Sequence, residues 1–269
     1  MGSRYFIVYT VRKPKAVEKA RELEMMIKNR GFIVDSMQIE DTVERGIPAD
    51  TEALIVLGGD GTLLKSVSIL PRPSIPILTI NYGRGGYLME VEPERSLKAV
   101  EDVLEGRYEI EKAIMLSFLI DRKKIADALN EAYISTVVPG KIIEFKVERN
   151  DVELYNGVGD ALIISTPLGS TAYAFSAGGP AVDDHLESAV LVPVCPLTNI
   201  RSVVLSLTNN FTITVESNTD IQILIDGHTQ RTFKKYVKLE VRKSEDYVSF
   251  IRFRDGESFA RRLKKRFKS

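Results

Sequence analysis

Cysteine is nearly absent from this sequence, and neither sign of charge is in excess. The single cysteine, Cys195, has no partner, so an intrachain disulfide is excluded and the composition fits a reducing compartment. The 37 basic and 37 acidic residues cancel, which argues against binding nucleic acid through a broad basic surface. The N-terminus has no secretion signal, and no apolar run approaches the ~20 residues of a membrane span. We therefore expect a cytoplasmic protein without a membrane partner.

The remaining composition is that of a folded protein large enough for more than one core. With 44% hydrophobic and 28% charged residues the chain resembles globular proteins, and its 269 residues favour two domains. The first third alternates between strand-like and helix-like runs. Strands are predicted at 4–10, 32–37, 53–57 and 76–80, and helices at 14–30 and 63–70. This alternation indicates a parallel sheet covered by helices, in which ligands bind at the carboxyl ends of the strands.

The pattern changes after a helix predicted at about 94–105, because short strand-like runs then dominate. Asn150-Asp151 is a predicted hairpin turn between two of these runs. Residues 257–269 have the pattern of a basic amphipathic helix. We expect an α/β domain at 1–96, a β-rich domain at 97–245, and a C-terminal strand and helix at 246–269 that return to the first domain.

The stretch ALIVLGGDGTLLK, residues 53–65, places a glycine-rich turn between a strand and a helix. Glycine permits positive φ and close approach of the backbone, and the N–H groups at a helix N-terminus attract phosphate. The stretch matches neither the Walker pattern GxxxxGK[ST] nor the dinucleotide pattern GxGxxG. Asp60 adds a negative charge to this turn, either as the N-cap of the helix or in a functional role, and the two roles can coexist.

Two further stretches combine polar groups in unusual ways. Residues 165–180, STPLGSTAYAFSAGGP, follow a predicted strand and contain several hydroxyl groups, aromatic rings and three glycines. This combination suits a ligand with many hydrogen-bonding groups and a flat ring, although a surface loop also has such a composition. Asn130-Glu131 interrupts the apolar run ALNEAYI. Polar side chains there cost free energy unless they are paired, face solvent or bind a ligand.

Taken together, these stretches make the sequence resemble the NAD kinase family. The family's motifs occur in the same order here: GGDGT at 58–62, NYGRGGYL at 81–88, NEAYI at 130–134, GDALIISTPLGSTAYAFSAGGP at 159–180, and a DG pair at 226–227. GGDG is also found in lipid kinases and phosphofructokinases, whereas the long 159–180 stretch is much more specific. The resemblance implies an α/β domain and a β-rich domain with the active site in the cleft between them. It also implies phosphorylation of the adenosine 2′-hydroxyl of NAD.

The resemblance assigns roles to individual residues. Asp60 matches the family's catalytic aspartate, which accepts or orients the proton of the attacking hydroxyl. The residues expected to bind NAD are Gly61, Asn130, Glu131, Lys141, Asp160, Thr171, Ala172, Tyr173, Ser176 and His228. The residues expected to present the loop to phosphate are Gly58, Gly59, Thr62 and Lys65. The resemblance further implies ATP as phosphoryl donor, a divalent metal such as Mg²⁺ that offsets charge around Asp60, and a homo-oligomer, either a dimer or a tetramer.

The chain departs from the family pattern near its last motif, since many relatives have Asp-Gly-Gln where this sequence has Asp226-Gly227-His228. The other histidine lies in the run Asp183-Asp184-His185, whose spacing matches no standard metal cage, and we assign no metal ligand there. Two alternatives remain open: a lipid or sugar kinase that shares GGDG, and a sensor that binds NAD or NADP without turnover. The first has no use for the 159–180 stretch, and the retention of Asp60 speaks against the second.

Overall fold

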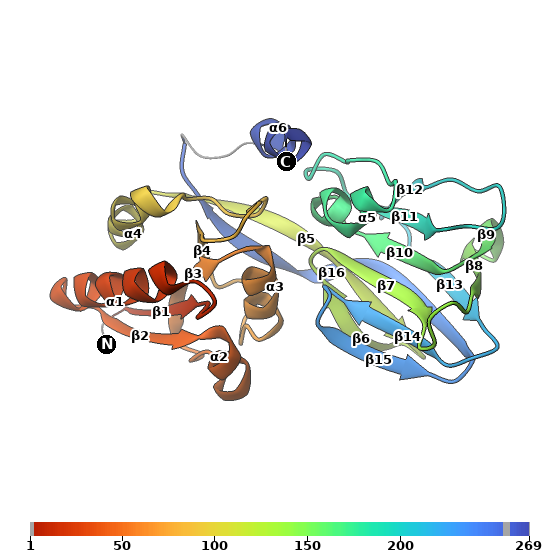
Figure 1. The fold of residues 1–269 in the computed structure, drawn as a ribbon, viewed down its shortest axis with the longest axis horizontal. Helices are drawn as coiled ribbons and strands as arrows, with labels where there is room; N and C mark the ends of the chain where they lie inside the picture. Colours follow the sequence, from red (N-terminus) through yellow and green to blue (C-terminus); the bar gives the residue numbers. More distant parts are fainter. Residues whose placement is uncertain (1–2, 255–258, 269) are drawn as a thin grey trace. The chain divides into compact units, whose positions relative to one another are not determined.

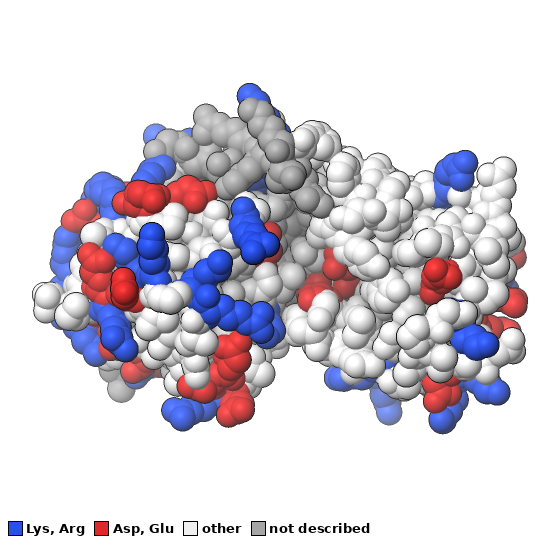
Figure 2. All heavy atoms as spheres, in the orientation of Figure 1, with Lys and Arg blue, Asp and Glu red and all other residues white. Residues whose placement is uncertain are grey.

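The computed structural model describes residues 3–254 and 259–268, and the chain divides into two compact units (Figure 1). Unit 1 contains residues 1–112 and 247–269, and unit 2 contains residues 113–246. None of the helices in the described part of the chain is long and apolar enough to span a membrane. On the face drawn in Figure 2, basic and acidic side chains are interspersed rather than sorted by sign.

A parallel sheet forms the centre of unit 1. Its strands lie in the order β2 (Ile33–Gln38), β1 (Arg4–Tyr9), β3 (Thr51–Gly58) and β4 (Ile77–Asn81). Strands β3 and β4 pair from Leu54↔Ile77 to Gly58↔Asn81, so their carboxyl ends lie side by side. The central residues of β3 are completely buried. A strand inside a parallel sheet is covered on both faces, which explains why β3 is a continuous apolar run.

Four helices accompany these strands: α1 (Pro14–Asn29), α2 (Ile39–Arg45), α3 (Asp60–Ser68) and α4 (Ser96–Leu104). A short 3-10 helix, Pro93–Arg95, precedes α4. Helix α1 buries Ala20, Leu23 and Ile27, which follow one another at helical spacing. Helix α4 adds Val100 and Val103 to the same apolar core. The helix predicted at about 94–105 is therefore part of unit 1.

The chain passes from one unit to the other at 112/113 and 246/247, whereas the sequence pattern predicted boundaries at 96/97 and 245/246. The first position differs because α4 and the beginning of β5 (Glu109–Ile120) stay with unit 1. A single strand, β16 (Tyr236–Arg252), crosses the second predicted boundary, after which a separate C-terminal strand was expected. Helix α6 (Phe259–Lys268) follows, and residues 257, 258 and 269 of the predicted tail helix lie outside the described residues.

Unit 2 is built from two sheets that share one apolar core. In the first, β16 pairs with β5 and β13 (Phe211–Glu216), β13 with β8 (Ile143–Arg149), β8 with β9 (Val152–Gly159), and β5 with β6 (Lys123–Ala128). The second has the order β12 (Val203–Ser206), β11 (Ser188–Val194), β10 (Ala161–Ser165), β7 (Glu131–Thr136), β14 (Ile221–Ile225) and β15 (Thr229–Phe233). Between β10 and β11 lie a 3-10 helix, Leu168–Thr171, and the short helix α5 (Tyr173–Ser176).

The predicted fold class, an α/β part followed by a β-rich part, is confirmed. The hairpin turn predicted at Asn150-Asp151 joins β8 to β9, and both residues have the positive φ that a type I′ turn requires. The helix predicted at 63–70 begins earlier, at Asp60. Glycine is a poor helix former, so the sequence suggests a turn where the structure has the first turn of α3.

Candidate active site

The glycine-rich stretch lies at the carboxyl end of β3 and turns directly into α3. Gly58 is the last residue of β3, Gly59 is the N-cap, and Asp60 is the first residue of the helix. A Cβ on Gly58 would lie 2.4 Å from the hydroxyl oxygen of Thr62, and one on Gly59 would lie 3.2 Å from the Cα of Gly83. The turn is therefore too close to its neighbours for a side chain at Gly58.

The carboxylate of Asp60 binds two backbone N–H groups of the segment after β4. Tyr87 N–H donates to Oδ2 at 3.1 Å, and Leu88 N–H donates to Oδ1 at 3.0 Å. Asp60 lies inside the helix, with Gly59 as the N-cap, so of the two alternatives left open for Asp60 the N-cap role does not hold. Its charge is still favourable in the first turn of a helix. The two N–H bonds fix the position of the carboxylate.

The segment 81–88 is held in place by its own first residue. The buried Asn81 accepts a hydrogen bond from Gly83 N–H at 2.9 Å and donates its amide to both oxygens of Glu92 at 3.2 Å. Gly86 has a φ of +61°, and a Cβ there would lie 2.6 Å from the Asn81 side chain. Tyr82 N–H donates to the carbonyl of Gly58 at 2.7 Å. The two glycine-rich loops of unit 1 are thus joined through their backbones.

In unit 2, Asn130 and Glu131 are ordered by an aspartate that the sequence did not single out as a site residue. The carboxylate of Asp226 accepts N–H bonds from Leu129 at 2.9 Å, Asn130 at 2.8 Å and Glu131 at 3.0 Å. Asp226 is buried and has a φ of +49° at the end of β14. The DG pair at 226–227 was the available signal, and the role of its carboxylate follows only from the pairing of β14 with β7.

Three buried polar atoms around Asp226 have no hydrogen-bond partner in the described protein: Asn130 Oδ1, Glu131 Oε2 and His228 Nε2. His228 Nδ1 lies 2.9 Å from the backbone carbonyl of Asp226, which can only accept, so Nδ1 carries the proton and Nε2 is an acceptor in the neutral ring. Buried polar atoms are nearly always hydrogen-bonded in folded proteins. Their concentration here indicates a ligand with donor groups.

Burial, and then the neighbouring charge of Asp226, raises the pKa of Glu131 to about 8. Burial also raises the pKa of Asp226, against the lowering effect of its three backbone N–H bonds. Both shifts come mainly from taking a carboxylate out of water, and for Glu131 the charge of Asp226 adds to the effect. Glu131 is therefore mainly protonated at neutral pH and can itself donate a hydrogen bond.

This shift predicts how stability depends on pH. The pKa of Glu131 is raised from its ordinary 4.5 to about 8 on folding, so the folded chain binds an extra proton between these values. The free energy of unfolding that Glu131 contributes is then full below pH 4.5 and is lost as the pH rises through about 8. We expect wild type to lose stability relative to Glu131→Gln over this window, as measured by urea unfolding at several pH values. If the difference in free energy of unfolding between wild type and Glu131→Gln did not change with pH, the raised pKa of Glu131 would be contradicted.

The stretch 165–176 packs against the backbone of Asn130. Ser165 Oγ donates to the carbonyl of Asn130 at 3.1 Å, and Thr166 Oγ1 donates to the carbonyl of Leu129 at 2.6 Å. A Cβ on Gly169 would lie 2.2 Å from the Asn130 carbonyl oxygen, so only glycine fits. These contacts bring the motif NEAYI, at 130–134, and the stretch 165–180 into one cluster.

The predicted NAD-binding residues of this stretch differ in exposure. Thr171 is buried, Ala172 is half-buried, and Ser176 is exposed. Tyr173 is 45% exposed, and its ring lies 5.4 Å from the ring of Tyr133, centroid to centroid. An exposed ring backed by a second ring is a suitable surface for a flat heterocycle.

Other predicted residues lie at the surface. Lys141 and Asp160 are exposed in unit 2, and their described hydrogen bonds involve backbone atoms. In unit 1, Gly61 is exposed and Lys65 is half-buried on α3. Their proposed contacts with NAD or phosphate stay predictions.

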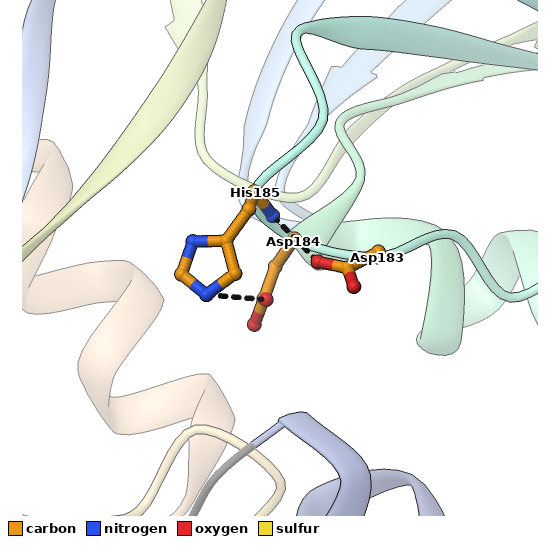
Figure 3. Close-up of side chains that lie close together, drawn as sticks. All are labelled: Asp183, Asp184 and His185. Atoms are coloured by element: carbon orange, nitrogen blue, oxygen red, sulfur yellow. Dashed lines mark hydrogen bonds and ion pairs between the residues drawn. The ribbon is translucent and has the colours of Figure 1, made fainter.

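The acidic run before β11 forms a local turn (Figure 3). His185 N–H donates to Asp183 Oδ1 at 3.0 Å, and His185 Nε2 lies 4.0 Å from Asp184 Oδ1. The possible ligand atoms of these residues lie within 4.8 Å of one another. Acidic residues that are adjacent in sequence often approach this closely, and we assign no ion to them.

Comparison with known proteins identifies relatives of this chain. Residues 5–108 match the ATP-NAD kinase N-terminal domain family, and residues 129–253 match the ATP-NAD kinase C-terminal domain family. The chain is 33% identical over 264 residues to the NAD kinase of Methanothermobacter thermautotrophicus, covering 94% of this chain and 92% of that protein. It is 32% identical over 271 residues to a bifunctional NADP phosphatase/NAD kinase of Methanocaldococcus jannaschii, covering 97% of this chain and 46% of that longer protein. Its fold matches the crystal structure of an NAD kinase from Archaeoglobus fulgidus in complex with ATP, with a TM-score of 0.81, 26% identity and 99% coverage of both chains.

Proposed function

This chain belongs to the NAD kinase family, and from that premise we propose that it transfers the γ-phosphoryl group of ATP to the 2′-hydroxyl of the adenosine ribose of NAD. The product is NADP, and ADP leaves. The observation that carries the assignment to particular residues is the fixed carboxylate of Asp60 at the N-terminus of α3, beside a turn that admits no side chain at Gly58.

In the proposed reaction Asp60 accepts the proton of the 2′-hydroxyl, or orients it, as the oxygen attacks the γ-phosphorus. The new O–P bond forms while the bond to the β-phosphate oxygen breaks. A general base increases the rate through its position as well as its basicity. The N–H bonds from Tyr87 and Leu88 hold the Asp60 carboxylate in a fixed position. Backbone N–H groups at the N-terminus of α3, which begins at Asp60, would bind phosphate oxygens.

The polar atoms around Asp226 are suited to the nucleoside part of NAD. Asn130 Oδ1 and His228 Nε2 are acceptors, which match the exocyclic amine of adenine and the hydroxyl groups of ribose. Glu131, whose pKa is raised to about 8 by burial, offers one donor and one acceptor at neutral pH. The exposed ring of Tyr173 is available for stacking on a base or on the nicotinamide ring.

A divalent metal ion such as Mg²⁺ would accompany ATP and reduce the repulsion between its phosphates and Asp60. The residues present fit such an ion, because Mg²⁺ prefers oxygen ligands bound through one or two carboxylates and the substrate phosphates. Asp60 supplies a carboxylate of this kind in the first turn of α3, beside the turn proposed to bind the phosphates.

The proposal predicts that the purified protein makes NADP from Mg-ATP and NAD, and that EDTA stops this turnover until Mg²⁺ is restored in excess. Each reaction is stopped by removing the divalent ion. NADP is then measured with a dehydrogenase that is specific for NADP and does not need a divalent ion. Binding of NAD without formation of NADP would support a sensor instead. Phosphorylation of a sugar or lipid, but not of NAD, would support the alternative of a lipid or sugar kinase that shares GGDG.

A further inference from the structure

The C-terminal helix α6 is rich in lysine and arginine, yet it buries one of its arginines. Arg262 is 2% exposed, whereas Lys264, two residues further along the same helix, is exposed. Burying a guanidinium group removes its hydration and is favourable only when other groups replace the lost water. The surroundings of Arg262 therefore indicate what this helix does.

Arg262 joins a buried cluster of charges in unit 1. Its Nη2 lies 3.9 Å from Glu111 Oε1, which also accepts a hydrogen bond from Arg252 Nη2 at 2.9 Å. Arg252 Nη1 in turn donates to Glu90 Oε2 at 3.1 Å. The cluster links two arginines to two glutamates, and all of them except the half-buried Glu111 are buried, so removing the charge of one arginine is unfavourable for the glutamates that remain.

The same arginine contacts the segment that binds Asp60. Its guanidinium carbon lies 5.9 Å from the ring centroid of Tyr87, within the range of a cation–π contact. The backbone N–H of Tyr87 donates to Asp60, and Glu90 of the charge cluster lies three residues further along. The segment 87–90 therefore binds the Asp60 carboxylate through its backbone, while its side chains at Tyr87 and Glu90 contact Arg262 and Arg252.

We propose that Arg262 is a positioning residue for the reaction. Through Arg262, helix α6 holds the segment 87–90, and this segment in turn holds the Asp60 carboxylate in the position and orientation needed for proton transfer. The inference rests on the proposed function, because it assigns the reacting carboxylate to Asp60. Arg262 itself touches no reacting atom in this scheme. Its effect is expected in kcat, since the predicted NAD-binding residues other than Gly61 belong to unit 2.

The kinetic test compares Arg262→Gln with Lys264→Gln, which removes one positive charge from the exposed face of the same helix. We expect Arg262→Gln to lower kcat for NADP formation roughly 10- to 100-fold with a much smaller change in the KM for NAD, because small displacements of a catalytic group have effects of this size. Lys264→Gln is expected to match wild type, and Arg262→Lys to recover part of kcat. Equal kcat values for Arg262→Gln and Lys264→Gln would overturn the inference.

A second measurement separates positioning from general loss of structure. Amide hydrogen exchange at Tyr87 and Leu88 is expected to speed up in Arg262→Gln, while Ile55 in the buried strand β3 keeps its protection. Unchanged protection of Tyr87 and Leu88 would overturn the inference even if kcat fell. This readout does not depend on turnover, so a wild-type protein that makes no NADP would refute the proposed function and leave the structural link testable by itself.

Discussion

Asp60→Asn is expected to lower kcat for NADP formation by about 100- to 10,000-fold, the range that general bases contribute. The asparagine side chain cannot accept the proton of the 2′-hydroxyl. It also presents an NH₂ group where the carboxylate accepts N–H bonds from both Tyr87 and Leu88. One of these N–H groups then faces another donor, so we also expect the thermal midpoint to fall by a few degrees, as about 1 kcal/mol is lost.

A matched control is Asp41→Asn, which neutralises an aspartate in the first turn of α2 in the same unit. Steady-state kinetics and calorimetric titration with NAD are run on both variants. If Asp60→Asn turns over at the wild-type rate, Asp60 is not the base. If it loses NAD binding as completely as turnover, its role is to hold the loop, and the assignment of the proton acceptor is wrong.

The sequence identified the turn at Asp60 because its information is local. A buried strand, three glycines and a carboxylate lie within a few residues, and their order alone points to a phosphate-binding turn. The sequence could not show that Asp60 binds the N–H groups of Tyr87 and Leu88, since that contact requires the parallel pairing of β3 with β4. It also placed the start of α3 too late, because glycine residues at 59 and 61 suggest a loop rather than a helix.

Residues whose contacts join distant parts of the chain were also missed, because these contacts depend on how the strands pair. Asp226 reaches the N–H groups of residues 129–131 only because β14 lies beside β7, and no pattern near Asp226 indicates this. Arg262 lies among several basic residues that are equivalent in the sequence, and only its burial against Tyr87 and Glu111 distinguishes it. Backbone hydrogen bonds and burial depend on topology, which local patterns constrain weakly.

Asp226→Ala is expected to reduce the free energy of unfolding by about 3 kcal/mol or more, because it leaves three buried backbone N–H groups without their acceptor. Part of this loss has a different cause: Asp226 has a φ of +49°, where alanine is strained. Asp121→Ala is the matched control, since Asp121 has the same φ of 49° in the turn between β5 and β6 but is exposed. Urea unfolding of the two variants separates the backbone strain from the lost hydrogen bonds.

The same substitution tests whether Asp226 organises a binding site. Its three N–H bonds set the direction of the backbone at Asn130 and Glu131, and therefore the position of the polar atoms predicted to meet NAD. Loss of even one hydrogen bond to the ligand, worth about 1.4 kcal/mol, weakens NAD binding roughly tenfold. Calorimetric titration should show this loss for Asp226→Ala and wild-type affinity for Asp121→Ala. If both variants lose equal stability and both bind NAD as wild type does, the Asp226 carboxylate neither holds this backbone nor shapes the site.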